Sequence, residues 1–192
     1  MLECKRLSAQ QDAFKPTSSS AMGDTPTLVS QHSVSSGVST VAGPDGISQF
    51  ERVHYWHGIS INPPELLYRS DLESNPFPIP FPGTALPVKT AEGVFNTPLN
   101  PVWHIVAPLI VELFKKRGIK YSALETARFT TEHEDGKKTL GPIVIWVATH
   151  PGATTTKNAC DVSPDVLHIL EDNGVKGAVV EWYEGSVEKL AG

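Results

Sequence analysis

The chain has 192 residues and a formal net charge of −5 at pH 7, a size that suits one domain with tails. Lys and Arg form no block or stripe, so we expect no nucleic-acid partner, because neutralising phosphates requires clustered cations. No stretch approaches the roughly 18 apolar residues of a membrane span, and the first residues lack a signal-peptide core. The sequence therefore predicts a soluble, cytoplasmic protein without a membrane partner, with Cys4 and Cys160 as reduced thiols.

The first half of the chain divides into two segments. Residues 1–50 are rich in serine and poor in large apolar side chains, so they cannot bury enough surface to offset their ordering entropy, and we predict a disordered tail. In residues 51–99, the stretch NPFPIPFPGTALPVK alternates proline with large apolar side chains. Proline favours extended backbone. We therefore predict an extended strap whose Phe77, Ile79 and Phe81 cover an apolar surface.

Residues 100–192 are predicted to form the folded domain. Asn100 and Pro101 are typical of a helix start, and Gly118 is typical of a helix end. The cluster Lys115–Arg117 falls in the last turn, where cations favour the negative end of the helix dipole.

Two strands are predicted next, in YSALETARFTTEHEDGKKTLGPIVIWVA, around a polar turn at residues 133–138. The second helix has two alternative starts. Either Thr155 or Thr156 caps a helix that bends at Pro164 and continues to Asp172, or the helix begins at Ser163. The stretch KGAVVEWYEG is predicted to be the final strand.

This order of elements predicts an α+β fold. If EGVFN (92–96) is a short strand, the pattern is βαββαβ, the ferredoxin-like arrangement; without that strand it is an αββαβ sandwich. Either way, two main helices should cover one face of the sheet. Residues 143–148 are apolar on both strand faces, so both faces must be dry. The strap, or a second copy of the chain in a homodimer, is expected to cover the second face.

Three polar residues on the strands are candidates for lining a cavity on the open sheet face, Glu125, Glu181 and Tyr183, and Arg128, on the other face of its strand, is a further ligand-binding candidate. Small molecules can bind such faces, an analogy at the level of the fold alone. Charged side chains on strands are usually wetted and deter edge aggregation. We favour the wetted interpretation for the carboxylates.

The loop after residue 148 holds the other candidates. His150, Cys160 and Asp161 are the residue types of a nucleophilic cysteine site, but no local signature enforces their assembly. Thr154, Thr155 and Thr156 could hold an anion at a helix start, although capping is the simpler interpretation. His54 and His57 lack further ligands, so we expect no metal, and no cofactor motif is present.

The stretches GPIVIWVATHPG, VLHILEDNGV and VVEWYE, with the upstream FNTPLNPVWHIVAPLIVELFKKRGIKYSALETARF, resemble a group of uncharacterised proteins of mushroom-forming fungi. The resemblance covers roughly residues 60 to 185, and its motifs are structural. Pro164, inside the helix on that comparison, departs from the pattern. The resemblance implies no activity.

Two classes of function remain open on these residues. The first is a non-catalytic module that binds a protein or a small ligand. The second is a small-molecule enzyme with a pocket on the open sheet face or in the 149–161 loop, using His150, Glu181 or Tyr183. The enzyme hypothesis requires His150 and Glu181 to share one concave, partly buried cavity.

Overall fold

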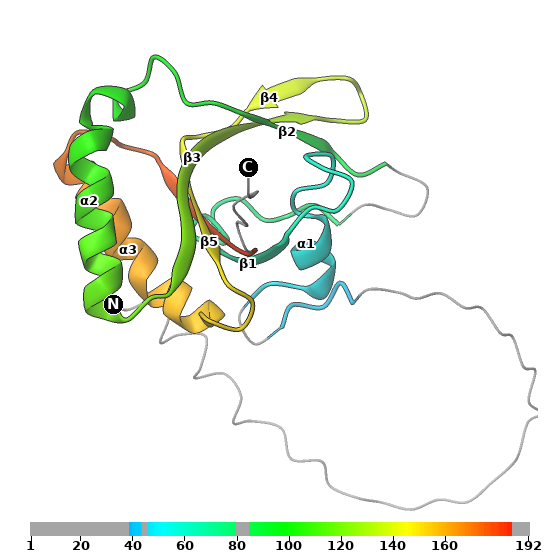
Figure 1. The fold of residues 1–192 in the computed structure, drawn as a ribbon. Helices are drawn as coiled ribbons and strands as arrows, with labels where there is room; N and C mark the ends of the chain where they lie inside the picture. Colours follow the sequence, from blue (N-terminus) through cyan, green and yellow to red (C-terminus); the bar gives the residue numbers. More distant parts are fainter. Residues whose placement is uncertain (1–38, 44–45, 80–84, 186–192) are drawn as a thin grey trace, which may run out of the picture.

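The computed structural model describes residues 39–43, 46–79 and 85–185, which form one curled sheet with helices on both sides (Figure 1). The helices are α1 (Gln49–His54), α2 (Leu99–Arg117) and α3 (Thr156–Asp172). The strands are β1 (Glu65–Arg69), β2 (Val88–Glu92), β3 (Tyr121–Glu132), β4 (Lys138–Leu140), β5 (Val144–Thr149) and β6 (Val179–Glu184). No helix within these ranges is long and apolar enough to cross a membrane.

The strands follow the order β1-β6-β5-β3-β2, with β4 also paired to β3. β5 and β6 are parallel, and the other pairs are antiparallel. The long strand β3 pairs with β5 along its first half and with β2 and β4 along its second half. The sheet thereby curls into a half-barrel, whose concave side lies away from α2 and α3 (Figure 1).

The α+β class and the two main helices on one face are confirmed, but the ferredoxin-like order is not. That arrangement splits its parallel pair with an intervening strand, whereas here β5 and β6 are direct neighbours joined through α3. The expected short strand at residues 92–96 lies earlier, at Val88–Glu92, and pairs with the far edge of β3. Residues 51–99 thus contribute two strands to the sheet in addition to extended chain.

The strand β5 is buried on both faces, as its sequence predicts. Ile145 and Val147, both 0% exposed, face the core formed with α2 and α3. On the concave side Val144 is 1% exposed and belongs to a second core, which contains Ile47, Tyr55 and Trp56. The chain itself therefore covers both faces of β5.

Phe77 of the predicted strap packs against this second core. Ile79, by contrast, is 55% exposed, and Phe81 lies outside the described residues. Most of the predicted tail is also outside them, but its last residues belong to the fold. Ile47 is buried, and the hydroxyl of Ser48 caps α1 by accepting from the backbone N–H of Glu51.

The helix boundaries follow local capping chemistry. α2 ends at Gly118, which adopts a φ of 67° that favours glycine. It starts at Leu99, one residue before the expected cap Asn100. α3 is capped by the Thr155 hydroxyl, which accepts from the N–H of Asn158, and it continues through Pro164. The alternative start at Ser163 is therefore wrong.

Candidate functional site

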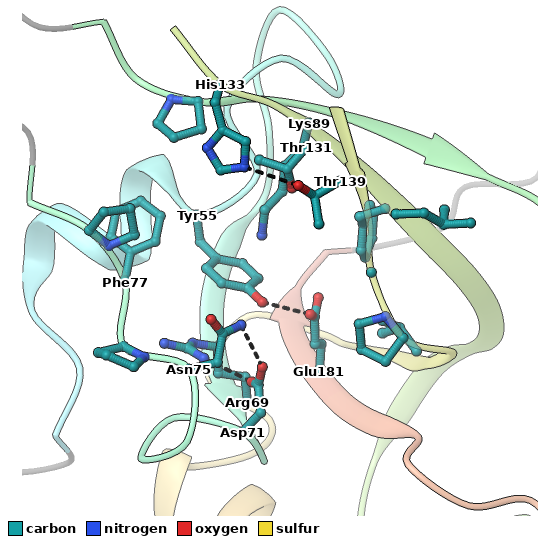
Figure 2. A pocket seen from close by; sticks show the side chains of 18 residues that line it. Tyr55, Arg69, Asp71, Asn75, Phe77, Lys89, Thr131, His133, Thr139 and Glu181 are labelled. Carbon is teal, nitrogen blue, oxygen red and sulfur yellow. Dashed lines mark hydrogen bonds and ion pairs between the residues drawn. The ribbon is translucent and has the colours of Figure 1, made fainter. Parts of the chain in front are cut away.

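A cavity of about 380 Å³ opens on the concave side of the half-barrel, between the second half of β3 and the segment around Phe77 (Figure 2). We call it the concave cavity. Its apolar wall comes from Tyr55, Pro76, Phe77, Pro78, Pro87, Phe129, Leu140, Gly141, Pro142 and Val144. Its polar groups belong to Arg69, Asp71, Asn75, Lys89, Thr131, His133, Thr139 and Glu181. A mostly apolar wall with a few polar groups is typical of small-molecule sites.

Glu181 lies at the base of this cavity and is 3% exposed. Its Oε1 accepts a hydrogen bond of 2.7 Å from the Tyr55 hydroxyl, and its Oε2 accepts one of 3.0 Å from the indole N–H of Trp56. Burial raises the pKa of Glu181, against the lowering effects of Lys89 and of these two donors. The wetted interpretation of this carboxylate is therefore wrong, because residues 55 and 56 close over the sheet face on which it sits.

Arg69, at the end of β1, is 0% exposed and holds two carboxylates. Its Nε lies 2.8 Å from Oε1 of Glu51, and its Nη1 lies 2.8 Å from Oδ1 of Asp71. Nη2 is buried and has no hydrogen-bond partner within the described residues. The guanidinium carbon lies 5.2 Å from the centroid of the Tyr55 ring, whose face stabilises the cation. Arg69 therefore anchors the wall beneath Tyr55.

Lys89 reaches from β2 toward the opposite face of the cavity, and its side chain is half-buried. Its Nζ lies 3.2 Å from the centroid of the Tyr55 ring and 5.8 Å from that of Phe129. In the part of the chain that the structure describes, this amine has no hydrogen-bond or ion-pair partner. Burial lowers the pKa of Lys89 to about 8, although Glu181 acts in the opposite direction.

These groups come from four separate elements, and Figure 2 shows how they meet. The Tyr55 ring stands in the middle, with Lys89 reaching toward it and Glu181 beside its hydroxyl. On another side Asn75 donates a 2.9 Å hydrogen bond to Asp71. The arrangement offers one amine with free donors, a row of aromatic and proline surfaces, and a buried carboxyl group.

The structure separates most of the strand candidates from this cavity. Glu125 is exposed, and Tyr183 packs against Trp56 and Trp146. Burial, assisted by Glu125, raises the pKa of Tyr183 to about 12. Arg128 donates from Nε and Nη2 to the carbonyl oxygen of Gly141, at 3.0 and 2.8 Å. Among the four, only Glu181 lines the concave cavity.

The loop candidates do not line the cavity either. His150 is exposed, so it does not share a buried cavity with Glu181. Cys160 is disulfide-bonded, so it is not the reduced thiol expected from the sequence. The Asp161 carboxylate pairs with Lys157 at 2.6 Å.

The three threonines at the start of α3 have structural partners. Thr155 caps the helix, Thr156 accepts from Arg52 at 3.4 Å, and the Thr154 hydroxyl donates to the carbonyl of Lys120 at 3.4 Å. Capping, the simpler interpretation, is thus confirmed for Thr155. Within the described ranges no three His, Cys, Asp or Glu residues are grouped to hold a metal ion.

Sequence reasoning missed Lys89 and Arg69. Lys89 lies inside the predicted strap, as the last residue of NPFPIPFPGTALPVK, and carries no motif around it. Arg69 follows Leu66, Leu67 and Tyr68. A cation at the end of an apolar run was the signal in the sequence that could have indicated a buried Arg69.

The chain was compared with protein-family models, with curated proteins and with solved structures, and none of the three comparisons gives a match.

Proposed function

We propose that this chain binds a small molecule in the concave cavity. The ligand presents an acceptor oxygen, of a carbonyl or carboxylate group, to Lys89, and its apolar body contacts Phe77 and Phe129. The observation that carries this proposal is the amine of Lys89, which lines a cavity of about 380 Å³ without a hydrogen-bond or ion-pair partner in the described residues. Ligand cavities typically span about 300–1,000 Å³.

Charge balance favours a ligand with few formal charges. Arg69 and Lys89 line the cavity together with Asp71 and Glu181, so the lining has no excess of positive charge to offset a multiply charged anion. A neutral carbonyl or a single carboxylate satisfies the Lys89 donors and leaves the aromatic and proline surfaces to an apolar body. Phe77, Phe129 and Tyr55 provide this contact surface.

The test compares acetophenone with its isostere α-methylstyrene, which replaces the carbonyl oxygen by a methylene group. We expect acetophenone to shift the backbone amide NMR signals of Phe129, Thr131 and Leu140 in the isotope-labelled full chain. A hydrogen bond to a charged donor contributes about 1.5–3 kcal/mol, so α-methylstyrene should bind at least about tenfold more weakly.

Variants at two lysines provide the control. Lys89→Met should reduce acetophenone binding to the level of α-methylstyrene, whereas Lys115→Met, at the exposed end of α2, should leave it unchanged. The proposal fails if acetophenone shifts only the signals near Ile105 and Leu109, two exposed apolar residues of α2, or shows no saturable shifts.

The alternative function is an enzyme that acts on a small molecule. The form of this hypothesis that needs His150 and Glu181 in one cavity fails, because His150 is exposed and does not line the concave cavity. An enzyme at this site would have to use Lys89 instead. That the chain binds a partner protein, or a second copy of itself, through a face of the sheet is a separate proposal. The described residues do not require it, because α1 and the residues after it cover the second face of β5.

A further inference from the structure

Lys89 differs from the other lysines of the described chain in its surroundings. The others are exposed on helix ends, turns and outer strands: Lys115, Lys116, Lys120, Lys137, Lys138 and Lys157, together with Lys176. Lys89 is half-buried, lies over the Tyr55 ring at 3.2 Å and lines the concave cavity. An incoming small molecule would therefore meet this amine inside an apolar enclosure.

An aromatic face is a weak partner for an amine compared with a carboxylate. The ring of Tyr55 attracts the charged form of the amine through its face. Once the amine is neutral, the ring does not occupy the nitrogen lone pair. No side chain of the described residues ties Nζ into a hydrogen bond. The nitrogen can therefore turn its lone pair toward the cavity without first breaking an ion pair.

We propose that Lys89 is a reactive amine that forms a reversible imine with small aldehydes held in the concave cavity. This inference rests on the proposed function, since the aldehyde must first bind there. It adds a covalent step and a substrate class, an apolar molecule with an aldehyde group.

The reaction is a condensation of the Lys89 amine with the aldehyde, and it releases water. The Nζ lone pair attacks the carbonyl carbon, and the π electrons move to the carbonyl oxygen, which takes a proton. The nitrogen loses one proton, and the hydroxyl group takes a further proton and leaves as water when the C–O bond breaks. The C=N bond of a protonated imine forms, with one net proton taken up from solvent, and this proton is released again when the imine becomes neutral. Water and protons exchange through the open cavity, and no oxidant or reductant is needed.

The residues around Lys89 favour both the attack by the neutral amine and the protonated imine that results. Since burial lowers the pKa of Lys89 to about 8, an appreciable fraction of the amine is neutral and nucleophilic near neutral pH. The carboxyl group of Glu181 lines the same cavity, and its negative form would stabilise a protonated imine.

The experiment uses benzaldehyde with sodium cyanoborohydride, which reduces an imine to a stable secondary amine. We expect the full chain to gain the mass of one benzyl group, and peptide mapping to place it on Lys89. Labelling at Lys89 should be at least about tenfold faster than at the exposed lysines at pH 7.5, because the lowered pKa of Lys89 leaves more of its amine neutral. Its rate should level off above about pH 8.

Lys89→Met and Lys89→Arg should both abolish the fast label, and Lys115→Met should retain it. The arginine variant keeps the positive charge, and it replaces the methionine variant in this test if the methionine variant fails to fold. Equal labelling of all lysines, while acetophenone still binds at Phe129 and Thr131, overturns the imine and leaves the proposed function standing. If neither benzaldehyde nor acetophenone perturbs the cavity residues, the proposed function fails as well.

Discussion

The hydroxyl of Tyr55 donates a 2.7 Å hydrogen bond to the buried carboxylate of Glu181, across 126 positions of sequence. The indole of Trp56 donates to the other oxygen of the same carboxylate. This pair of donors attaches the segment after α1 to β6 and closes the concave side of the sheet.

Glu181→Gln should change the free energy of unfolding by no more than about 1 kcal/mol at pH 7, because the amide oxygen can accept from Trp56 while its NH₂ group donates to the Tyr55 oxygen. Glu181→Leu should cost about 2–5 kcal/mol, since it leaves two buried donors unsatisfied. Urea unfolding measures both changes.

The pH dependence of the same pair checks the direction of the Glu181 pKa. Its folded pKa is raised, so the native state binds more protons than the unfolded state above the ordinary pKa of glutamate. Relative to Glu181→Gln, the wild-type protein should lose stability as the pH rises from 4.5. A gain over that range would contradict a burial-raised pKa.

Arg69→Met should destabilise the protein by about 3–5 kcal/mol, because it leaves the buried carboxylates of Glu51 and Asp71 without their cation. The matched control is Arg117→Met, which breaks an exposed pair with Asp165 and should cost less than about 1 kcal/mol. Thermal unfolding followed by circular dichroism compares the two. Similar losses for both variants would show that burial does not set the strength of the Arg69 cluster.

The stability of the Lys89→Met variant, relative to that of the wild-type protein, should be greatest at low pH. The pKa of Lys89 falls from 10.5 to about 8 on folding, so the cost of burying its charge is fully present below pH 8 and disappears as the pH rises toward 10.5. The wild-type protein should therefore gain up to about 3 kcal/mol on the variant between pH 7 and pH 10.5. Parallel urea titrations at these pH values measure the difference, and a constant difference would contradict the lowered pKa.

Ser163→Ala should destabilise the protein by about 1–3 kcal/mol, because it removes the acceptor of the Trp182 indole N–H. The Ser163 hydroxyl lies 2.8 Å from Nε1 of Trp182 and donates in turn to the carbonyl of Ala159 at 2.7 Å. In a double-mutant cycle with Trp182→Phe, the two losses should fall short of additivity by about 1 kcal/mol. Additive losses would show that this hydrogen bond contributes nothing.

Local chemistry in the sequence predicted several features of the fold. The apolar stretch 143–148 indicated a strand dry on both faces, and Ile145 and Val147 are fully buried. Gly118 ends α2 and Thr155 caps α3, as their residue types favour. These features depend on neighbours within a few residues, which the sequence displays directly.

The strand order and the cavity depended on contacts between distant residues. The length of β3 and its bend allow β2, β4 and β5 to pair along one strand, and no local pattern encodes that division. Glu181 was interpreted as wetted because a lone carboxylate on a strand usually is, and only the placement of Tyr55 and Trp56 reverses this. The sequence by itself determined α2, α3, β3, β5 and β6, since capping and apolar alternation act within one or two turns, but it did not reveal α1, β1 or β4 and it misplaced β2. The tertiary structure alone decided that Lys89, Tyr55 and Glu181 share one cavity, because burial, hydrogen bonding and titration arise where separate elements meet.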